Sequence, residues 1–179
     1  MKRVLNVGSG GNTNIPVDFK DWEQVPLDIH PEVEPDIVLD ARDMHTLDPA
    51  QYDAVFSSHA LEHFYKHEVE SIVRGMMHVL KPDGTVYAIV PNVPRLLDLM
   101  RERQYDLDDV FYRVDGRMPV SFHDVLYGLG SAMAKGNPYY AHKCAFTKIS
   151  LGELFEYCGL KDVEVGGDDY NLVVRGIKC

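Results

Sequence analysis

Glycines follow the first apolar stretch of the chain directly, and an acid ends the second. Val4-Leu5-Asn6-Val7 runs into Gly8-Ser9-Gly10-Gly11, and Asp28 ends Val25-Pro26-Leu27. Glycine lets a backbone approach a ligand without interference from a Cβ atom. In open α/β sheets an acid about 20 residues after such a turn can hold ribose hydroxyls. These residues predict a nucleotide-type site, and the alternative is a tight loop beside a solvated strand end.

The type of nucleotide follows from what the turn lacks. The dinucleotide fingerprint G-x-G-x-x-G needs a glycine at position 13, where Thr13 stands. A phosphate-binding loop needs Gly-Lys-Ser/Thr after its glycines, and the turn has no such sequence. The turn is therefore typical of neither NAD nor ATP binding.

A second group of reactive residues reads H-x-x-E-H. His59, Glu62 and His63 stand at the spacing of a zinc-peptidase motif. If this segment is helical, both histidines share a face and Glu62 is placed as a base. A peptidase also needs a third ligand and a cleft, and no later segment indicates either. We expect a ligand-contacting loop with no metal, and a zinc hydrolase stays as the remote alternative.

The elements that must position these residues alternate along the first half of the chain. One apolar-faced helix is predicted over residues 67–80, ended by Pro82 and Gly84. Short β-rich runs separated by crossovers predict a parallel sheet. The predicted strands are residues 3–7, 24–29, 36–39, 52–57 and 84–91.

The second half of the chain predicts an insert and an antiparallel end to the sheet. Residues 92–149 are far longer than an ordinary connection and rich in aromatic residues, so we interpret them as a lid with helices over residues 94–103 and 120–134. Ser150 and Glu153 form a predicted capping box that opens a helix over residues 151–157. The last two predicted strands, residues 160–165 and 171–177, are joined by a connection short enough for a hairpin.

The ordered set of motifs resembles one family, the class I S-adenosylmethionine-dependent methyltransferases, in particular their small-molecule type. The glycine turn and Asp28 resemble the first two motifs. The segments 40–44, 52–63, 80–85 and 146–160 are similar to the later ones. The resemblance implies an α/β, three-layer Rossmann-like methyltransferase sandwich, with a mostly parallel sheet and an antiparallel C-terminal strand, in one domain over residues 1–179. It also implies that S-adenosyl-L-methionine is the cofactor, bound by Gly8, Ser9, Gly10, Asp28, Ile29, Asp40, Ala41 and Ser57.

Two departures from the family pattern concern the methionine end of the cofactor. Asn6 stands where the family usually has an acid, and Asn12 where it often has another glycine. The first crossover, residues 12–23, contains Pro16 and little helical periodicity, so we expect a loop or a short helical turn there. A binding or scaffold module that keeps the fold without catalysis is therefore the main alternative function.

Methyl transfer from a sulfonium is an in-line displacement, which needs a base only if the acceptor must lose a proton. His142 is the first candidate for that base, followed by His59 and then His123. Tyr127, Tyr139 and Tyr140 are candidates to line the acceptor pocket. The sequence after the fourth predicted strand lacks the Asn-Pro-Pro-Tyr and Pro-Cys motifs of enzymes that act on nucleic acids or proteins, which favours a metabolite, sugar or lipid precursor as acceptor.

Composition narrows the class of protein. The chain has 179 residues, 45% of them hydrophobic, and a formal net charge of −10, which opposes nonspecific nucleic-acid binding. Three cysteines are too few for a disulfide framework and suit a reducing compartment. No apolar run approaches the ~20 residues of a membrane span. We expect a cytoplasmic enzyme with a small-molecule partner, and the sequence does not indicate its oligomeric state.

Overall fold

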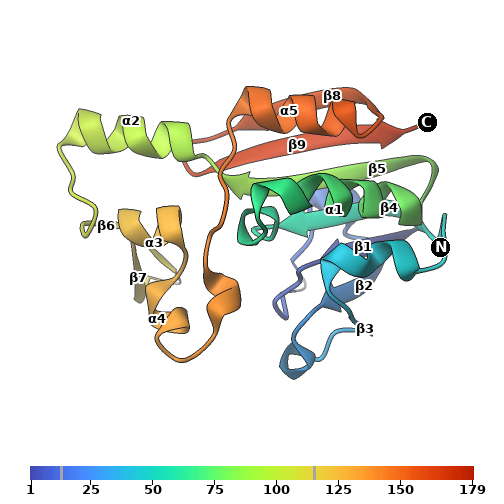
Figure 1. Cartoon of the computed structure of the whole chain (residues 1–179), viewed down its shortest axis with the longest axis horizontal. Helices are drawn as coiled ribbons and strands as arrows, with labels where there is room; N and C mark the ends of the chain where they lie inside the picture. Colours follow the sequence, from blue (N-terminus) through green and yellow to red (C-terminus); the bar gives the residue numbers. More distant parts are fainter. Residues whose placement is uncertain (13, 115) are drawn as a thin grey trace.

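A seven-stranded sheet with the order β3-β2-β1-β4-β5-β9-β8 forms the centre of the computed structural model (Figure 1). The structure describes residues 1–12, 14–114 and 116–179. Strands β1 to β5 pair in parallel, and β9 runs antiparallel to both β5 and β8. The strands are β1 Arg3–Val7, β2 Glu23–Asp28, β3 Ile37–Val38, β4 Tyr52–Ser58, β5 Leu80–Pro91, β8 Leu160–Gly167 and β9 Asn171–Lys178. The predicted Rossmann-like methyltransferase fold class is confirmed.

Alternation along the strands divides the core between the two faces of the sheet. In β1, Leu5 and Val7 belong to the main core, which α1 (Lys66–Val79), α5 (Lys148–Tyr157) and the short helix η3 (Ala41–Thr46) cover. Val4 belongs to a smaller core on the opposite face. Burial of both sets fixes the register of β1, because a slip by one residue would exchange its two faces.

The first crossover contains a single short 3-10 helix, η1 (Val17–Phe19), which confirms the expectation for residues 12–23, apart from position 13, which lies outside the described residues. Phe19 packs against Trp22 in the smaller core, with ring centroids 5.0 Å apart. This aromatic contact lets an irregular segment cover a sheet face that a helix covers in other α/β proteins.

The predicted start of the C-terminal helix is wrong by three residues. Thr147, and not Ser150, is the N-cap of α5: its Oγ1 accepts a hydrogen bond from the Ser150 amide, and Ser150 Oγ accepts one from the Thr147 amide. Both residues can cap a helix, and the reciprocal pair of bonds is formed one turn earlier than the pattern with Glu153 predicts.

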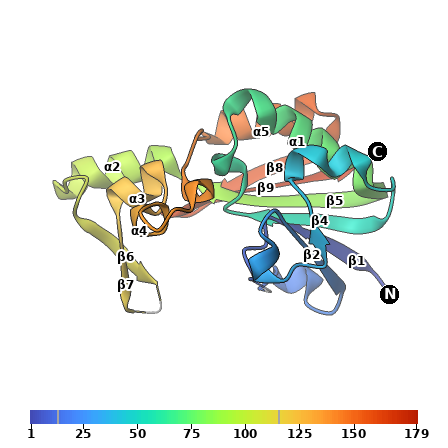
Figure 2. The ribbon, with the colours of Figure 1, turned by 60° about the horizontal axis from the view of Figure 1, so that its bottom comes forward.

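The insert between β5 and α5 lies beside the carboxyl ends of the parallel strands in both ribbon views (Figures 1 and 2). The helix predicted over residues 120–134 is divided into two shorter helices within that range. Gly128 interrupts it with φ 97°, and a Cβ atom there would lie 1.8 Å from the Tyr140 carbonyl oxygen. The insert contains α2 Val93–Arg103, β6 Val110–Val114, β7 Met118–Ser121, α3 Phe122–Tyr127, α4 Gly130–Met133 and η5 Pro138–Tyr140.

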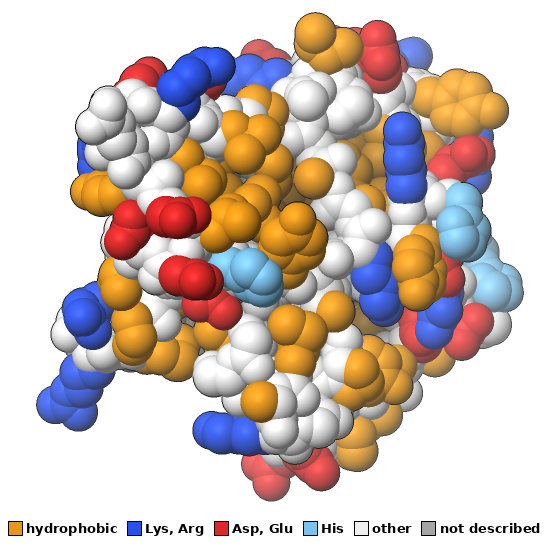
Figure 3. Space-filling model, turned by 60° about the vertical axis from the view of Figure 1, so that its left-hand side comes forward, with side chains coloured by type: hydrophobic (Ala, Val, Ile, Leu, Met, Phe, Trp, Pro, Cys, Tyr) orange, Lys and Arg blue, Asp and Glu red, His pale blue; other side chains and the backbone are white. Residues whose placement is uncertain are grey.

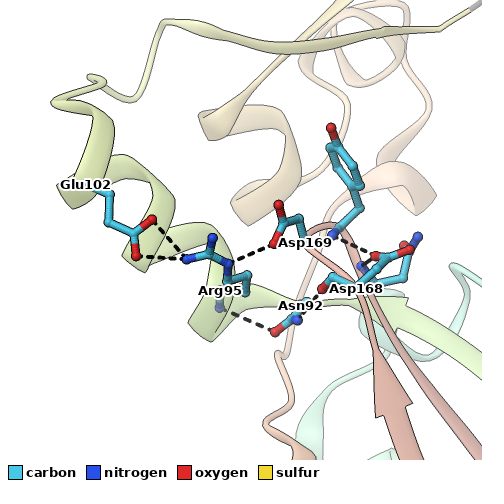
Figure 4. Close-up of polar contacts among 7 residues, drawn as sticks. Asn92, Arg95, Glu102, Asp168 and Asp169 are labelled. Carbon is cyan, nitrogen blue, oxygen red and sulfur yellow. Dashed lines mark hydrogen bonds and ion pairs between the residues drawn. The ribbon is translucent and has the colours of Figure 1, made fainter.

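Polar contacts fasten the start of the insert to the turn between β8 and β9 (Figure 4). Asn92 caps α2 and donates its Nδ2 hydrogen to the Asp168 carbonyl oxygen at 2.7 Å. Arg95 Nε donates to Asp169 Oδ1 at 2.9 Å, and the same guanidinium contacts Glu102 about two turns further along the same face of α2. These bonds set the direction in which α2 leaves the sheet. Across the described residues, no helix combines the length and apolarity needed to cross a membrane.

Candidate active site at the carboxyl ends of the strands

The glycine turn and the acid at the end of β2 lie in contact. Gly10 donates its amide hydrogen to Asp28 Oδ2 at 2.7 Å, and His30 donates to Asp28 Oδ1 at 2.9 Å. The amides of Gly8 and Ser9 both donate to the Leu27 carbonyl oxygen. Residues that are 18 positions apart in the sequence therefore form one rigid corner at the end of the sheet.

Gly8 is required at its position on two grounds. Its φ is 69°, in the left-handed region that favours glycine. A Cβ atom there would lie 2.6 Å from the Cβ atom of Ala60, in the loop after β4. The turn thus approaches that loop more closely than any residue with a side chain would allow.

A cavity of about 240 Å³ opens beside this corner. Of the eight residues that the resemblance implies for the cofactor, six line it: Gly8, Gly10, Asp28, Ile29, Asp40 and Ala41. Ser9 and Ser57 are buried beside it without lining it, and their hydroxyls have no hydrogen-bond partner among the described residues. The cavity also has walls that the sequence did not indicate, among them His30, Arg42 and Lys143.

An ion-pair network closes one side of this cavity. Asp40 caps η3 by accepting the Arg42 amide hydrogen, and its carboxylate pairs with the Arg42 guanidinium at 2.6 Å. The hydrogen bonds from Arg42 hold the pKa of Asp40 below its usual value. Arg42 also contacts Glu68 on α1 at 2.9 Å, so the network joins η3 to α1.

Asn6, the departure from the family pattern on β1, has a structural role. It is 3% exposed, and its Nδ2 donates to the Asn12 carbonyl oxygen at 3.0 Å. The bond ties the end of the glycine turn to the strand that precedes it. An acid at position 6 could not donate this hydrogen bond in its ionised form, since a carboxylate only accepts.

A second cavity, of about 530 Å³, lies between the insert and the sheet. Its walls are mainly apolar and aromatic: Pro91, Phe111, Tyr112, Val114, Met118, Val120, Val125, Leu129 and Tyr170. Figure 3 shows the side of the molecule where the insert lies, with hydrophobic side chains gathered in the centre of that face. His59, His63 and Tyr140 line both cavities, so the two spaces meet at these residues.

Four of the polar residues that line the second cavity form one group from two distant segments. Glu62 is 1% exposed, its Oε1 lies 3.3 Å from His59 Nδ1, and the same oxygen lies 4.0 Å from His142 Nε2. His63 completes the group, with its ring centroid 4.9 Å from that of His142. His59 has φ 52°, a left-handed backbone that is uncommon outside glycine.

The pKa values of the two candidate bases, His59 and His142, are shifted in opposite directions. Burial lowers the pKa of His59, but the Glu62 carboxylate and the Asn171 side chain together outweigh burial, and the pKa is raised. Burial is the main cause that lowers the pKa of His142 below its ordinary value. His142 is therefore more readily in the neutral form that can accept a proton, and His59 more readily in the protonated form.

The structure separates the predicted site residues into those it brings together and those it does not. Tyr140 lines both cavities and Tyr139 lines the smaller one, whereas Tyr127 and His123 are in the walls of neither of these two. The premise of a helical H-x-x-E-H segment is wrong: Leu61–His63 is a 3-10 turn, and His59 precedes it with a left-handed backbone. Glu62 and His63 meet His142 instead.

Comparison with known proteins agrees with this geometry. Residues 5–88 match a family model described as a methyltransferase domain. No curated protein sequence matches the chain significantly. Among solved structures, an S-adenosylmethionine-dependent methyltransferase from Archaeoglobus fulgidus superposes with a TM-score of 0.63 at 15% identity, over 99% of this chain and 86% of that one.

Two further similar structures have defined substrates or ligands. The 1,6-didemethyltoxoflavin-N1-methyltransferase of Burkholderia thailandensis, with bound 1,6-didemethyltoxoflavin and S-adenosylhomocysteine, gives a TM-score of 0.56 at 15% identity, covering 98% of this chain and 70% of that one. Phosphoethanolamine N-methyltransferase 2 of Haemonchus contortus, in complex with S-adenosyl-L-methionine, gives 0.59 at 12% identity; 99% of this chain spans only 48% of that one. The family-model match over residues 5–88, the sheet topology and the similar solved structures are consistent with a class I, Rossmann-like S-adenosylmethionine-dependent methyltransferase, whose cofactor is S-adenosylmethionine.

Proposed function

We propose that this protein transfers the methyl group of S-adenosyl-L-methionine to a small molecule held in the cavity of about 530 Å³ under the insert. One observation carries the proposal: the smaller cavity at the glycine turn and the larger aromatic cavity meet at His59, His63 and Tyr140. An in-line displacement needs donor and acceptor on opposite sides of one transferred carbon. Two adjoining cavities with a shared wall provide that arrangement.

The residues of the smaller cavity fit the cofactor. Gly10 has no atom within 4 Å of the position that a Cβ atom would take, so its backbone faces open space, and Asp28 ends β2 with a carboxylate at the cavity wall. We assign the ribose hydroxyls to Asp28, and the adenine to the side of Ile29, Asp40 and Ala41. When bound, the cofactor supplies the electrophilic methyl group. Ser9 and Ser57 remain proposed supports of this wall, since both are buried next to it.

The acceptor is proposed to lie against the aromatic walls, with its nucleophilic atom toward Tyr140. If that atom carries a proton, His142 is the proposed base, because its Nε2 faces the Glu62 side of the cavity and its ring is only 13% exposed. His59 stands at the junction and is the second candidate. A concave cavity of about 530 Å³ with mainly apolar and aromatic walls favours a partly apolar small molecule as acceptor.

A binding module without catalysis is the second candidate function. It is favoured by Asn6, which replaces an acid, and by the absence of an α-helix among the described residues of the first crossover. The dipole of such a helix would contribute to binding the cofactor carboxylate. Turnover of any acceptor with labelled methyl donor would exclude this candidate.

Calorimetric titration with S-adenosylhomocysteine tests the cofactor assignment. We expect one site per chain, weakened at least tenfold by Asp28→Ala, because that change removes the carboxylate and frees the Gly10 amide. Asp36→Ala is the matched control, since Asp36 is an exposed acid next to β3 that lines neither cavity. Titrations of the unmodified protein that show no heat at any concentration would overturn the proposal.

A further inference from the structure

Glu62, His63 and His142 form a cluster that the fold brings together from two distant segments. One ligand atom of each residue, a carboxylate oxygen or a ring nitrogen, lies within 4.8 Å of those of the other two. We call these three residues the Glu62 cluster. All three line the larger cavity, so anything held by the cluster faces the proposed acceptor.

The carboxylate of Glu62 is buried without a donor. Both of its oxygens are inaccessible, and neither has a hydrogen-bond partner among the described residues. The nearest ring nitrogens, His59 Nδ1 at 3.3 Å and His142 Nε2 at 4.0 Å, lie at ion-pair distance when the imidazoles are protonated, but neither makes a hydrogen bond to the carboxylate. A buried carboxylate without hydrogen bonds is costly, and a cation is the usual partner that offsets this cost.

Backbone carbonyl groups orient both imidazoles of the cluster. His63 Nδ1 lies 3.1 Å from the Ala141 carbonyl oxygen, and His142 Nδ1 lies 2.9 Å from that of Val125. A carbonyl oxygen only accepts, so each Nδ1 carries the hydrogen and each Nε2 keeps a free lone pair. Metal-binding histidines are commonly fixed in this way by a carbonyl or carboxylate behind the ring.

Main-chain bonds hold the two segments of the cluster in place. The Glu62 carbonyl oxygen accepts hydrogen bonds from the amides of Lys143 and Cys144, at 2.7 Å and 3.3 Å. The amide of His142 donates to the Tyr127 carbonyl oxygen at 3.0 Å. The cluster is therefore set by backbone geometry on both sides and does not depend on mobile side chains alone.

We propose that the Glu62 cluster binds one divalent first-row transition-metal cation of the zinc type, through Glu62, His63 Nε2 and His142 Nε2. Two imidazoles and one carboxylate suit such cations, whereas Mg²⁺ and Ca²⁺ prefer oxygen ligands alone. With Zn–N and Zn–O distances of about 2.0–2.2 Å, tetrahedral ligands lie about 3.4 Å apart. The ligand atoms would need to approach one another by up to about 1.4 Å from their separation of up to 4.8 Å.

Three protein ligands leave a coordination position open toward the larger cavity. That position would accept an oxygen atom of the acceptor and orient it for transfer, a role that rests on the proposed function. The cation and a transferred proton would use the same Nε2 lone pair, so His142 serves as ligand or as base and not as both. His59 lies outside the cluster and keeps its place between the cavities.

Cobalt titration of the full chain tests the site. Protein without a histidine tag, freed of metal by a chelator, is titrated with CoCl₂ while visible d–d absorption is recorded, and Zn²⁺ is then added as competitor. We expect saturation at one Co²⁺ per chain and loss of the absorption when Zn²⁺ displaces it. Glu62→Gln and His142→Gln should each weaken Co²⁺ binding at least tenfold, since each removes one of three ligands.

Two controls keep the result interpretable. His123→Gln changes an exposed histidine outside the cluster and should leave Co²⁺ binding unchanged. Thermal unfolding shows whether the Glu62→Gln and His142→Gln proteins are folded. If one of them is not, Co²⁺ binding by the other variant and competition by Zn²⁺ in the unmodified protein test the site. The inference is overturned if the unmodified protein gives no saturable absorption, or if folded Glu62→Gln and His142→Gln proteins bind Co²⁺ as it does.

S-adenosylhomocysteine titration of the same samples separates this inference from the proposed function. Glu62 and His142 do not line the smaller cavity, so cofactor binding should survive in both variants. Loss of Co²⁺ binding with cofactor binding retained supports the metal site. Saturable Co²⁺ binding in a chain that binds no cofactor would contradict the proposed function and leave the metal site standing.

Discussion

Replacement of Gly8 by alanine isolates the contact between the glycine turn and the loop after β4. The new Cβ atom would lie 2.6 Å from Ala60 Cβ, and the backbone would hold alanine at φ 69°. The left-handed backbone costs about 1–2 kcal/mol for a residue with a side chain. Overpacking against Ala60, which is only 6% exposed, adds about 1–3 kcal/mol.

Gly10→Ala is the matched variant. Gly10 also has a positive φ, 55°, but no atom lies within 4 Å of the Cβ atom it would acquire. Gly10→Ala should therefore lower the free energy of unfolding only by the cost of the left-handed backbone, about 1–2 kcal/mol. The difference between the two variants, about 1–3 kcal/mol, measures the Ala60 contact. Urea unfolding followed by circular dichroism gives both values.

The double variant Gly8→Ala with Ala60→Gly completes the test. Removing Ala60 Cβ leaves only the Ala60 Cα atom near the new methyl group, at 3.9 Å, which is ordinary contact. The double variant should recover the contact part of the loss, so the two changes should couple and not add. A Gly8→Ala protein as stable as Gly10→Ala, or a double variant without recovery, would refute the close approach of the two loops.

Two further predictions concern stability, one at the start of α5 and one at Asp124 in the wall of the larger cavity. Thr147→Ala should lower the free energy of unfolding by about 1 kcal/mol, because it removes the N-cap of α5, whereas Ile149→Ala, at a 72% exposed position, should change it little; an equal effect of both would contradict the cap. Asp124 accepts hydrogen bonds from the amides of Ser121 and Gly130 and from the Ser121 hydroxyl; burial opposes ionisation, but these bonds outweigh it and lower its pKa below 3.8. The ionised Asp124 carboxylate contributes its full stability above the unfolded-state pKa, and this contribution is lost as the pH falls through the lowered pKa of the folded state. In urea titrations, the difference in the free energy of unfolding between the unmodified protein and Asp124→Asn should therefore shrink from pH 7 toward pH 3. A difference that stays constant would exclude ionisation of Asp124 as its source.

The sequence predicts the sheet and the glycine corner because both depend on local patterns. The apolar run of β1, the glycines after it and Asp28 at the end of β2 are adjacent in the fold for the same reason that parallel strands end together. The helical stretch over α1 follows from one apolar face of regular period. These features need no knowledge of distant contacts.

The insert and the Glu62 cluster could not be predicted in the same way. Gly128 breaks the predicted helix because the chain passes against the Tyr140 carbonyl oxygen, a contact that no local pattern reveals. Glu62 and His63 were visible in the H-x-x-E-H pattern, but their partner His142 comes from the far end of the insert. The pairing depends on main-chain bonds between Glu62 and residues 143 and 144, which any residue types could form.

Hydrogen bonds attach the insert to the rest of the fold at both of its ends. Asn92 and Arg95 secure the departing chain to the β8–β9 turn, and the amides of Lys143 and Cys144 secure the returning chain to Glu62. The hairpin β6–β7 between these anchors contributes Phe111, Tyr112 and Met118 to the cavity wall. Under the proposed function, evolution or design can therefore change this hairpin to suit a new acceptor while the smaller cavity, proposed to bind the methyl donor, keeps its geometry.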